Sequence, residues 1–227
     1  MAININYIGH SAFFVKSKNS GILIDPFITG NPKAICKFKK EDITHIFVTH
    51  GHGDHLGDAI PISKATKTPI FAIFELANYC MQKGAVANGV NIGGKLELPF
   101  GCARFLPAFH SSSTPDGIYA GMPASVLLDV DGIKIYHAGD TCLNSEMKTV
   151  GEIYKPDIAI LPVGSCYTMD TEDAVVAAKW LGVKKVIPMH YDTFDAIKVD
   201  VAKMTEAFES QNIECIILNS GESIELQ

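Results

Sequence analysis

The chain of 227 residues is long enough to bury a substantial core and suits a single domain. Its residues are 47% hydrophobic and 19% charged, a composition typical of a globular protein and not of a disordered one. A net charge of −6 and a single arginine, Arg104, give neither the basic surface that nucleic acids and anionic membranes require nor an arginine cluster for phosphate. We therefore expect a small-molecule substrate, no nucleic-acid partner and no membrane span, and the sequence leaves homo-oligomerisation open.

The start of the chain and its cysteines both favour a cytoplasmic protein. The first residues, MAININYIGHSAFF, lack the basic segment and the uninterrupted apolar run of a signal peptide. The six cysteines are scattered without a C-x-x-C pair, and a disulfide framework is typical of much shorter secreted chains. The prediction is one cytoplasmic domain, residues 1–227, with reduced thiols.

The first third of the chain predicts short strands that lead into a histidine-rich loop. Apolar and polar residues alternate at the start, and short apolar segments follow on either side of an Asn-Ser-Gly turn. Strands are expected at 3–7, 12–15, 21–25, 44–50 and 69–73, and helices at 59–66 and 75–83.

The rest of the chain predicts four strands and then an alternation of helices and strands. The four strands are expected at 95–100, 102–109, 124–130 and 133–138, with an Asp131-Gly132 hairpin turn between the last two. Helices are expected at 145–154, 172–182 and 199–211, strands at 157–163 and 184–190, and a closing hairpin at 214–219 and 223–226. This order favours an α/β fold in which helices cover the outer faces of sheets.

The loop VTHGHGDHLGD, residues 48–58, contains four potential metal ligands within six positions: His50, His52, Asp54 and His55. Zinc binds neutral imidazole and carboxylate oxygen, and a site needs three or four such ligands. Residues two positions apart in an extended loop point the same way, so His50 and His52 can share one ion, while Asp54 and His55 lie on an adjacent face. A lone histidine is usually an ordinary polar residue, but this spacing indicates a metal site.

Three further ligands are expected where apolar strands end. His110, Asp140 and His190 each follow such a strand at its carboxyl end, where α/β proteins collect functional residues. Taken singly, His110 and His190 also fit loop caps and Asp140 fits a turn cap. Their coincidence favours one metal site built from several strand ends.

These motifs resemble those of the metallo-β-lactamase-fold hydrolases. The resemblance covers essentially the whole chain, and its carriers are ILIDP, THGHGDH, PAFHS, HAGDT and PMHY, at residues 22–26, 49–55, 107–111, 137–141 and 188–191. The motifs look closest to a branch of small, largely uncharacterised metal-dependent hydrolases related to ascorbate-6-phosphate lactonase and to N-acyl-phosphatidylethanolamine phospholipase D. The resemblance implies an α/β fold of four layers, an αββα sandwich of two mixed β-sheets with helices on the outer faces.

The resemblance also implies two divalent ions and a division of the ligands between them. It assigns to the first ion His50, His52 and His110, to the second Asp54, His55 and His190, and to both Asp140. The ligand set suits Zn²⁺ first, with Mn²⁺ and Ni²⁺ also compatible. The implied activity is metal-dependent hydrolysis of a small ester, lactone, phosphodiester or amide by a metal-bound hydroxide. In single-metal relatives the carboxylate at Asp54 acts as a base, so its catalytic role depends on occupancy.

Two residues near the metal loop have expected supporting roles. Asp25, at the end of a strand, is either a turn former or, as the resemblance implies, an acceptor that fixes a metal-bound imidazole. His10 lies in a turn at the same end of the sheet, and it is a candidate for contacting substrate or assisting proton transfer. A plain turn residue is the alternative for His10, and His45 and His137, inside strands, are expected to be structural.

The remaining candidates concern the substrate. Ser111, Thr168 and Asp170 are candidates for substrate contact, although Asp170 also fits a helix cap, as does Asp58 earlier in the chain. Ser165 and Cys166 stand in a segment where relatives often carry Gly or Asp, a departure that leaves the ligand set intact.

Three other functions are compatible with a histidine–carboxylate site of this kind, but each fits the sequence less well than hydrolysis. A diiron redox protein of this fold typically has glutamate in place of His52 and an attached flavin domain. An RNA-processing nuclease needs extra arms or an inserted domain, and this acidic chain has no room for them. A non-catalytic metal-binding or sensor protein would more often have a closed, cysteine-rich site.

Overall fold

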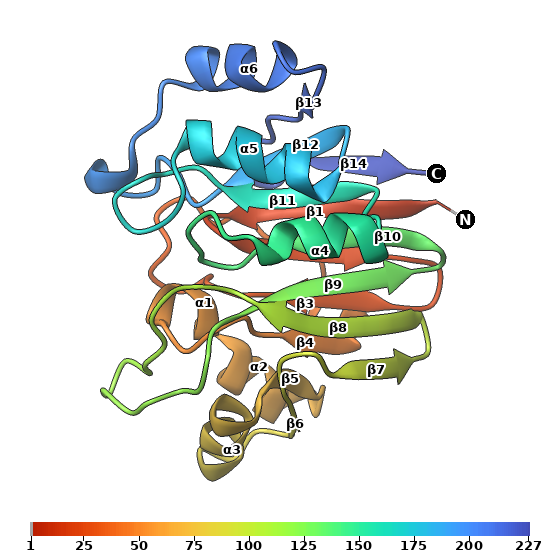
Figure 1. Cartoon of the computed structure of the whole chain (residues 1–227). Helices are drawn as coiled ribbons and strands as arrows, with labels where there is room; N and C mark the ends of the chain where they lie inside the picture. Colours follow the sequence, from red (N-terminus) through yellow and green to blue (C-terminus); the bar gives the residue numbers. More distant parts are fainter. Residues whose placement is uncertain (1) are drawn as a thin grey trace.

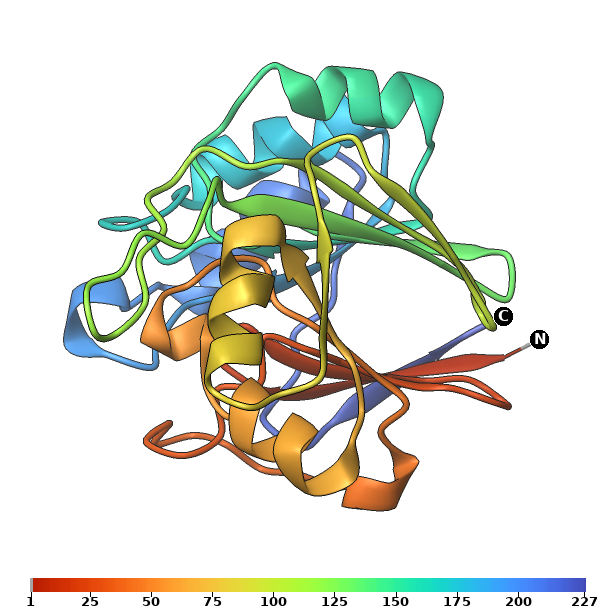
Figure 2. The same cartoon turned by 90° about the horizontal axis from the view of Figure 1, so that it is seen from below.

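Two seven-stranded β-sheets lie face to face, and helices cover the outer side of each (Figures 1 and 2). The computed structural model describes residues 2–227. The expected α/β architecture of two mixed sheets between outer helices is confirmed. Within the described residues, no helix has both the length and the apolar character that a membrane span requires.

The first sheet contains the amino-terminal strands and the last strand of the chain. Its order is β14-β1-β2-β3-β4-β5-β6, antiparallel from β14 to β3 and parallel from β3 to β6. The strands are β1 (Ile3–Gly9), β2 (Ala12–Lys16), β3 (Gly21–Ile24), β4 (His45–Phe47), β5 (Ile70–Ile73), β6 (Ala87–Val90) and β14 (Ser223–Leu226).

The second sheet repeats this plan with the middle and later strands. Its order is β13-β12-β11-β10-β9-β8-β7, antiparallel from β7 to β10 and parallel from β10 to β13. The Asp131-Gly132 turn joins β9 and β10 as expected, with positive φ at both residues. The strands are β7 (Lys95–Leu98), β8 (Gly101–Pro107), β9 (Ala124–Val130), β10 (Ile133–His137), β11 (Ile158–Pro162), β12 (Lys185–Met189) and β13 (Glu214–Cys215).

Helices divide between the two outer faces. Those that follow strands of the first sheet cover that sheet, and those that follow strands of the second cover the second (Figure 2). The helices are α1 (Gly53–Leu56), α2 (Ala59–Thr66), α3 (Phe74–Gln82), α4 (Glu146–Ile153), α5 (Thr171–Leu181) and α6 (Val201–Glu209), with short 3₁₀ turns at Lys40–Asp42 and Asp195–Ile197.

Apolar side chains from both sheets fill the space between them. Phe47 of β4 and Phe105 of β8 pack with ring centroids 6.1 Å apart, and Phe13 of β2 contacts His137 of β10 edge to face. These residues are fully buried within one continuous core. This shared apolar core fixes the two sheets against each other, so the strand ends of both sheets keep fixed positions at their common edge.

Two sequence-based expectations about the fold were wrong. Segments 214–219 and 223–226 do not form a closing hairpin, because β13 pairs with β12 in one sheet and β14 pairs with β1 in the other. Gly221 donates its N–H to the carbonyl of Tyr7, so the chain crosses between sheets at this turn. Asp58 precedes α2 but does not cap it, since its carboxylate accepts the N–H groups of Ile28 and Thr29.

Candidate metal centre

The predicted ligands meet at one edge of the sandwich, on the left of Figure 1 where α1 lies. Strands β8 and β10 both run antiparallel to β9, and β12 runs parallel to β10 through β11, so these three strands end at the same edge. The loop after β4 comes from the opposite sheet and reaches the same place. The structure therefore brings together all seven predicted ligands.

The first group of ligands consists of His50, His52 and His110, whose donor atoms lie within 4.8 Å of one another. Nε2 of His50 is 3.0 Å from Nδ1 of His52, and the His110 ring stands edge to face against both. Two imidazole nitrogens at this distance either form a hydrogen bond, in which one carries the proton, or coordinate the same cation. Three converging imidazoles suit a tetrahedral ion such as Zn²⁺.

The second group contains Asp54, His55, His190 and also His10, again with donor atoms within 4.8 Å. Oδ2 of Asp54 lies 3.7 Å from Nε2 of His190 and 4.0 Å from Nε2 of His55. The sequence did not indicate that His10 would lie within this group of potential ligands. Its Nε2 faces the carboxylate of Asp54, 3.1 Å from Oδ2.

Asp140 lies between the two groups. Its Oδ2 is 3.2 Å from Nε2 of His55, 3.1 Å from Nε2 of His190 and 3.7 Å from Nε2 of His110. Its carboxylate also clusters with His50 and His55. A carboxylate in contact with both groups is in the position required of a residue that binds two ions.

Several buried polar atoms at this edge have no hydrogen-bond partner within the described chain. They include Nε2 of His55, Oδ1 of Asp140 and Nδ1 of His190. Nε2 of His55 is close to Asp140 but without the alignment of a hydrogen bond. Unpartnered buried groups are costly and rare, and coordination of a cation would satisfy the first two. The donor set therefore fits divalent ions of the zinc type.

Charges within the cluster separate the two groups. Burial lowers the pKa of His50 well below its ordinary value and also lowers the pKa values of His52 and His110. These imidazoles are neutral, the form that binds metal. Burial also opposes a charge on His190, but Asp140 outweighs it and raises the pKa of His190 to about 9. The second group thus attracts positive charge, whether as protons or as a metal ion.

Asp25 lies beneath the metal loop and connects two of its histidines. Its Oδ2 accepts a hydrogen bond from Nδ1 of His55 at 2.7 Å and from Oγ1 of Thr49 at 2.6 Å. Its Oδ1 accepts the N–H of Thr49 at 2.8 Å, and Nδ1 of His50 lies 3.1 Å from the Thr49 hydroxyl. With Nδ1 protonated in both rings, the Nε2 atoms of His50 and His55 are left free to face the cluster.

His10 is fully buried, and hydrogen bonds occupy both nitrogens of its ring. Nε2 lies 3.1 Å from Oδ2 of Asp54, and Nδ1 lies 2.9 Å from Oγ1 of Thr193. Its carbonyl accepts hydrogen bonds from the Tyr7 hydroxyl and from the N–H of His190. Burial lowers the pKa of His10 to about 4, despite the raising effect of Asp54, so the ring is neutral. Both ring nitrogens are therefore engaged within the protein, and a role of His10 in substrate contact or proton transfer stays a prediction.

Left-handed backbone conformations gather at this edge. His10, Asp25 and His190 have φ values of 60°, 44° and 57°, a region that residues with a Cβ rarely adopt. Such conformations cost about 1–3 kcal/mol each and persist only where surrounding contacts enforce them. Here they turn three side chains toward one cluster at the points where strands end.

The expected substrate contacts lie around the cluster but differ in their surroundings. Oγ of the exposed Ser111 is 3.4 Å from Nε2 of His52. Thr168 directs its hydroxyl to the carbonyl of Met169, and Asp170 caps α5 by accepting the N–H of Asp173. Ser165 and Cys166 are exposed and left-handed in the same loop. Only Ser111 among these contacts a predicted ligand directly.

Sequence reasoning missed two threonines that support the cluster, while the two histidines expected to be structural form hydrogen bonds outside it. Thr49 links His50 to Asp25, and Thr193 fixes the His10 ring. No motif marks either hydroxyl, although Thr49 directly precedes the histidine pair. His137 accepts the N–H of Gly139 and bonds the carbonyl of Ser11, while His45 pairs with the Thr44 hydroxyl.

Two mixed sheets with outer helices, and a histidine–carboxylate cluster at their common edge, define a metallo-β-lactamase-type fold. Residues 4–190 match the family model described as the beta-lactamase superfamily domain, and the chain belongs to that superfamily. The resemblance inferred from the motifs is therefore confirmed.

Relatives are found among both sequences and solved structures. The chain is 43% identical over 229 aligned residues to a Bacillus cereus (strain ATCC 14579) protein named UPF0173 metal-dependent hydrolase, covering 99% of this chain and all of that protein. It is 38% identical to Igni18, a metallo hydrolase of the archaeon Ignicoccus hospitalis, with a TM-score of 0.89 over 100% of this chain and 99% of that one. YhfI of Bacillus subtilis, a metallo-beta-lactamase fold protein, shares the fold at 17% identity, with a TM-score of 0.78 over 99% of each chain.

Proposed function

We propose that this chain is a metal-dependent hydrolase that binds two divalent ions, with Zn²⁺ preferred and Mn²⁺ or Ni²⁺ as alternatives. The observation that carries the proposal is the convergence of seven histidine and aspartate side chains at one edge of the sandwich. Two of the seven, His55 and Asp140, have a buried polar atom without a hydrogen-bond partner in the described chain. Such a set has no structural purpose that the core requires, because the surrounding strands are already tied by their own hydrogen bonds. The similar proteins that are named as metal-dependent hydrolases support the same class.

The ligands divide according to the two groups. We assign one ion to His50, His52 and His110 and the other to Asp54, His55 and His190, with Asp140 shared between them. Ions bound there would lower the pKa of a coordinated water and polarise the bond to be cleaved. The chain itself contributes the geometry, since the Asp25 network sets the tautomers of His50 and His55 before any ion binds.

Asp54 and His10 act together in this proposal. The side chain of Asp54 is 30% exposed, so one face of its carboxylate can be reached from solvent. Burial opposes its charge, but the hydrogen bond from His10 and the nearby His190 ring outweigh that effect and hold the pKa of Asp54 below its ordinary value. Asp54 is then ionised and able to bind an ion or accept a proton. We assign His10 a positioning role, because its ring holds Asp54 while Thr193 holds the ring.

The substrate enters from the exposed side of the cluster, where Ser111, His52 and Asp54 lie. We propose a small ester, lactone, phosphodiester or amide, with Ser111 available to hydrogen-bond it. The cytoplasm is the proposed location, since all six cysteines are free thiols.

The test is a substrate screen on protein depleted of metal and then reloaded separately with Zn²⁺, Mn²⁺ or Ni²⁺. Hydrolysis of an ester, lactone, phosphodiester or amide that depends on the added ion is the expected result, and Asp140→Asn serves as the inactive reference. Hydrolysis that is equally fast in metal-depleted protein and in Asp140→Asn would contradict the proposal. Metal content measured on each sample separates loss of the ion from loss of activity.

A further inference from the structure

Exposed apolar side chains gather at the edge that holds the metal centre. In the part of the chain that the structure describes, eleven large hydrophobic side chains are exposed. Six of them belong to the loops that follow β8, β11 and β12, and we call this set the apolar rim: Phe109, Ile118, Tyr119, Met122, Tyr167 and Phe194. Tyr119 and Tyr167 are 69% and 59% exposed. Exposed apolar side chains on the loops around a candidate site favour binding of an apolar group there.

Each loop of the apolar rim is tied to a residue of the metal centre or its neighbour. The N–H of Phe109, beside His110, donates to the hydroxyl of Thr141, and the N–H of Met169 donates to the carbonyl of Thr141. The Phe194 ring lies 5.5 Å from the His10 ring. These contacts tie the loops that carry the apolar rim to the residues around the metal centre.

The loop of residues 111–122 rests directly on the metal loop. A Cβ added to Gly51 would lie only 2.4 Å from Cβ of Ala120, so the two loops approach as closely as glycine allows. The N–H of Gly51 donates to the hydroxyl of Ser112. Ile118, Tyr119 and Met122 are therefore carried on a loop in contact with the H-x-H motif.

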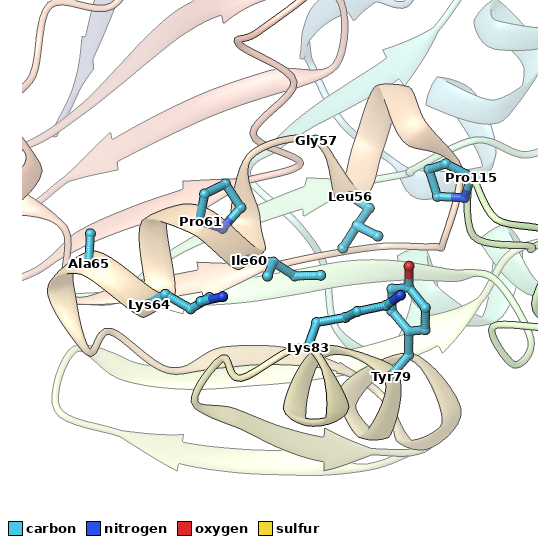
Figure 3. Close-up of a pocket in the computed structure, with 9 residues that line it drawn as sticks. All are labelled: Leu56, Gly57, Ile60, Pro61, Lys64, Ala65, Tyr79, Lys83 and Pro115. Carbon is cyan, nitrogen blue, oxygen red and sulfur yellow. The ribbon is translucent and has the colours of Figure 1, made fainter.

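The other side of this loop is anchored to α3. Figure 3 shows Tyr79 and Lys83 side by side in the groove between α2 and α3, with Pro115 of the loop at its end. The hydroxyl of Tyr79 and the ammonium of Lys83 both donate to the carboxylate of Asp116, at 2.9 and 3.0 Å. The loop is thus held from both sides, and the charge of Asp116 is offset by Lys83.

The same edge offers little to an anionic substrate. The loops that follow β8, β10, β11 and β12 contain no arginine and a single lysine, Lys198, whose ammonium lies 2.7 Å from Asp195. They also contain Asp170 and Asp192, which have no lysine partner within the described chain. Carboxylates near a binding site repel anions. Lys33, exposed in the loop after β3, is a cation from the first sheet, so an anionic probe belongs in the test.

We infer that the apolar rim binds the uncharged, apolar acyl or aryl arm of an ester, lactone or amide substrate. The inference rests on the proposed hydrolase function and narrows its substrate class, because it places anionic phosphodiesters and carboxylated esters outside that class. The metal centre receives the bond to be cleaved, and the rim receives the arm attached to it.

The experiment compares three 4-nitrophenyl esters on zinc-loaded protein: the acetate, the hexanoate and the monoester of adipic acid. The hexanoate and the adipate monoester have acyl chains of equal carbon number and differ by a terminal carboxylate. We expect kcat/KM for the hexanoate to exceed that for the acetate by about tenfold or more. The adipate monoester should fall about tenfold or more below the hexanoate, because its carboxylate meets an acidic edge.

Substitutions within the rim separate it from the rest of the surface. Tyr119→Ser and Tyr167→Ser should each lower the ratio of hexanoate to acetate kcat/KM by about threefold or more. Each substitution removes an aromatic ring of the protein that would contact the acyl arm of the substrate. The matched control is Ile153→Ser, which removes an exposed apolar side chain at the carboxyl end of α4, away from the metal edge. The ratio should remain unchanged in this control.

Four outcomes would overturn the inference. Equal or faster cleavage of the adipate monoester, or of bis(4-nitrophenyl) phosphate, would reject an uncharged substrate while leaving a hydrolase in place. A chain-length ratio that neither tyrosine substitution changes would remove the rim from binding. Co-sedimentation with phosphatidylcholine vesicles that both tyrosine substitutions abolish, without a chain-length effect, would make the rim a lipid contact. Absence of zinc-dependent cleavage of all four probes would overturn the hydrolase proposal and this inference together.

Discussion

Oδ2 of Asp25 lies 2.7 Å from Nδ1 of His55, and both side chains are fully buried. This pair sets which nitrogen of His55 faces Asp140 and the other ligands, because Asp25 is acceptor-only when ionised. The tautomer is therefore fixed by a residue that contacts no substrate and follows strand β3, far from His55 in sequence. The consequence can be measured directly.

Asp25→Asn should weaken metal binding by about 10–100-fold with the fold retained. Asparagine keeps the size of the side chain and tolerates the φ of 44° at this position. Its amide oxygen is a weaker acceptor than a carboxylate, and its NH₂ group would face one of the groups that now donate a hydrogen bond to Asp25. Chelator competition measures the affinity. Asp157→Asn is the control, since its carboxylate accepts the N–H of Lys134 at 2.8 Å outside the cluster. Equal metal affinity in Asp25→Asn and parent would show that the tautomer does not depend on Asp25.

Asp140→Asn should release at least one ion and lower activity by roughly 10²-fold or more, because a neutral amide offsets the repulsion between two cations poorly. The strands do not depend on this side chain, so circular dichroism should match the parent. Metal content and the rate on a verified substrate are the measurements. A folded variant with both ions and near-parental activity would mean that Asp140 serves only the turn.

His10→Leu should lower kcat and the occupancy of one ion, because Asp54 loses the donor that orients it. His10→Gln should restore part of both, since its amide reaches the place of Nε2. If His10 instead bound the substrate, its substitution would raise KM and leave the metal content unchanged. Thr193→Val, which removes the partner of Nδ1, should show a smaller effect in the same direction. Parental kinetics and metal content in His10→Leu would return His10 to a plain turn residue.

Metal-depleted protein should bind two Zn²⁺ per chain and become more stable as it does. Ligand at about 100 times its dissociation constant adds about 2.7 kcal/mol per site to the free energy of unfolding. Thermal unfolding with and without Zn²⁺, together with elemental analysis, tests this expectation. Mg²⁺ is the control ion, because it prefers oxygen ligands and should produce little shift. Saturation at one ion per chain would remove the two-ion arrangement and Asp140 as a shared ligand.

The residues that meet at the candidate metal centre were predictable from the sequence because their signals are local. His50, His52, Asp54 and His55 lie in one loop, and the other ligands each follow an apolar strand that can be identified without knowing its neighbours. The up–down–up order of the first three strands also placed His10 and Asp25 at one end, as the antiparallel pairings show.

Features that depend on distant pairing were not predictable in the same way. The Ser220-Gly221 turn has the composition of a hairpin, yet β14 pairs with β1, from the opposite end of the chain. Strand β6 was missed because its sequence, ANGV, is polar and half-exposed, and it becomes a strand only by pairing with β5. Thr193 reaches His10 only through the fold, so no spacing rule could identify that hydrogen bond.

The pairing of β14 with β1 has a consequence for how the protein is made. A ribosome synthesises β1 before any other strand of its sheet and β14 after all of them, so the outer edge of β1 has no partner until β14 has been made. Unpaired strand edges recruit other chains, and nascent proteins are exposed to that hazard longest when the covering strand comes last. Asn4 and Asn6, polar residues within β1, make this strand less apolar while its outer edge is unpaired. The first sheet can be completed only after β14 has left the exit tunnel, so the hydrogen bonds between β14 and β1 form after the rest of the sheet has been synthesised.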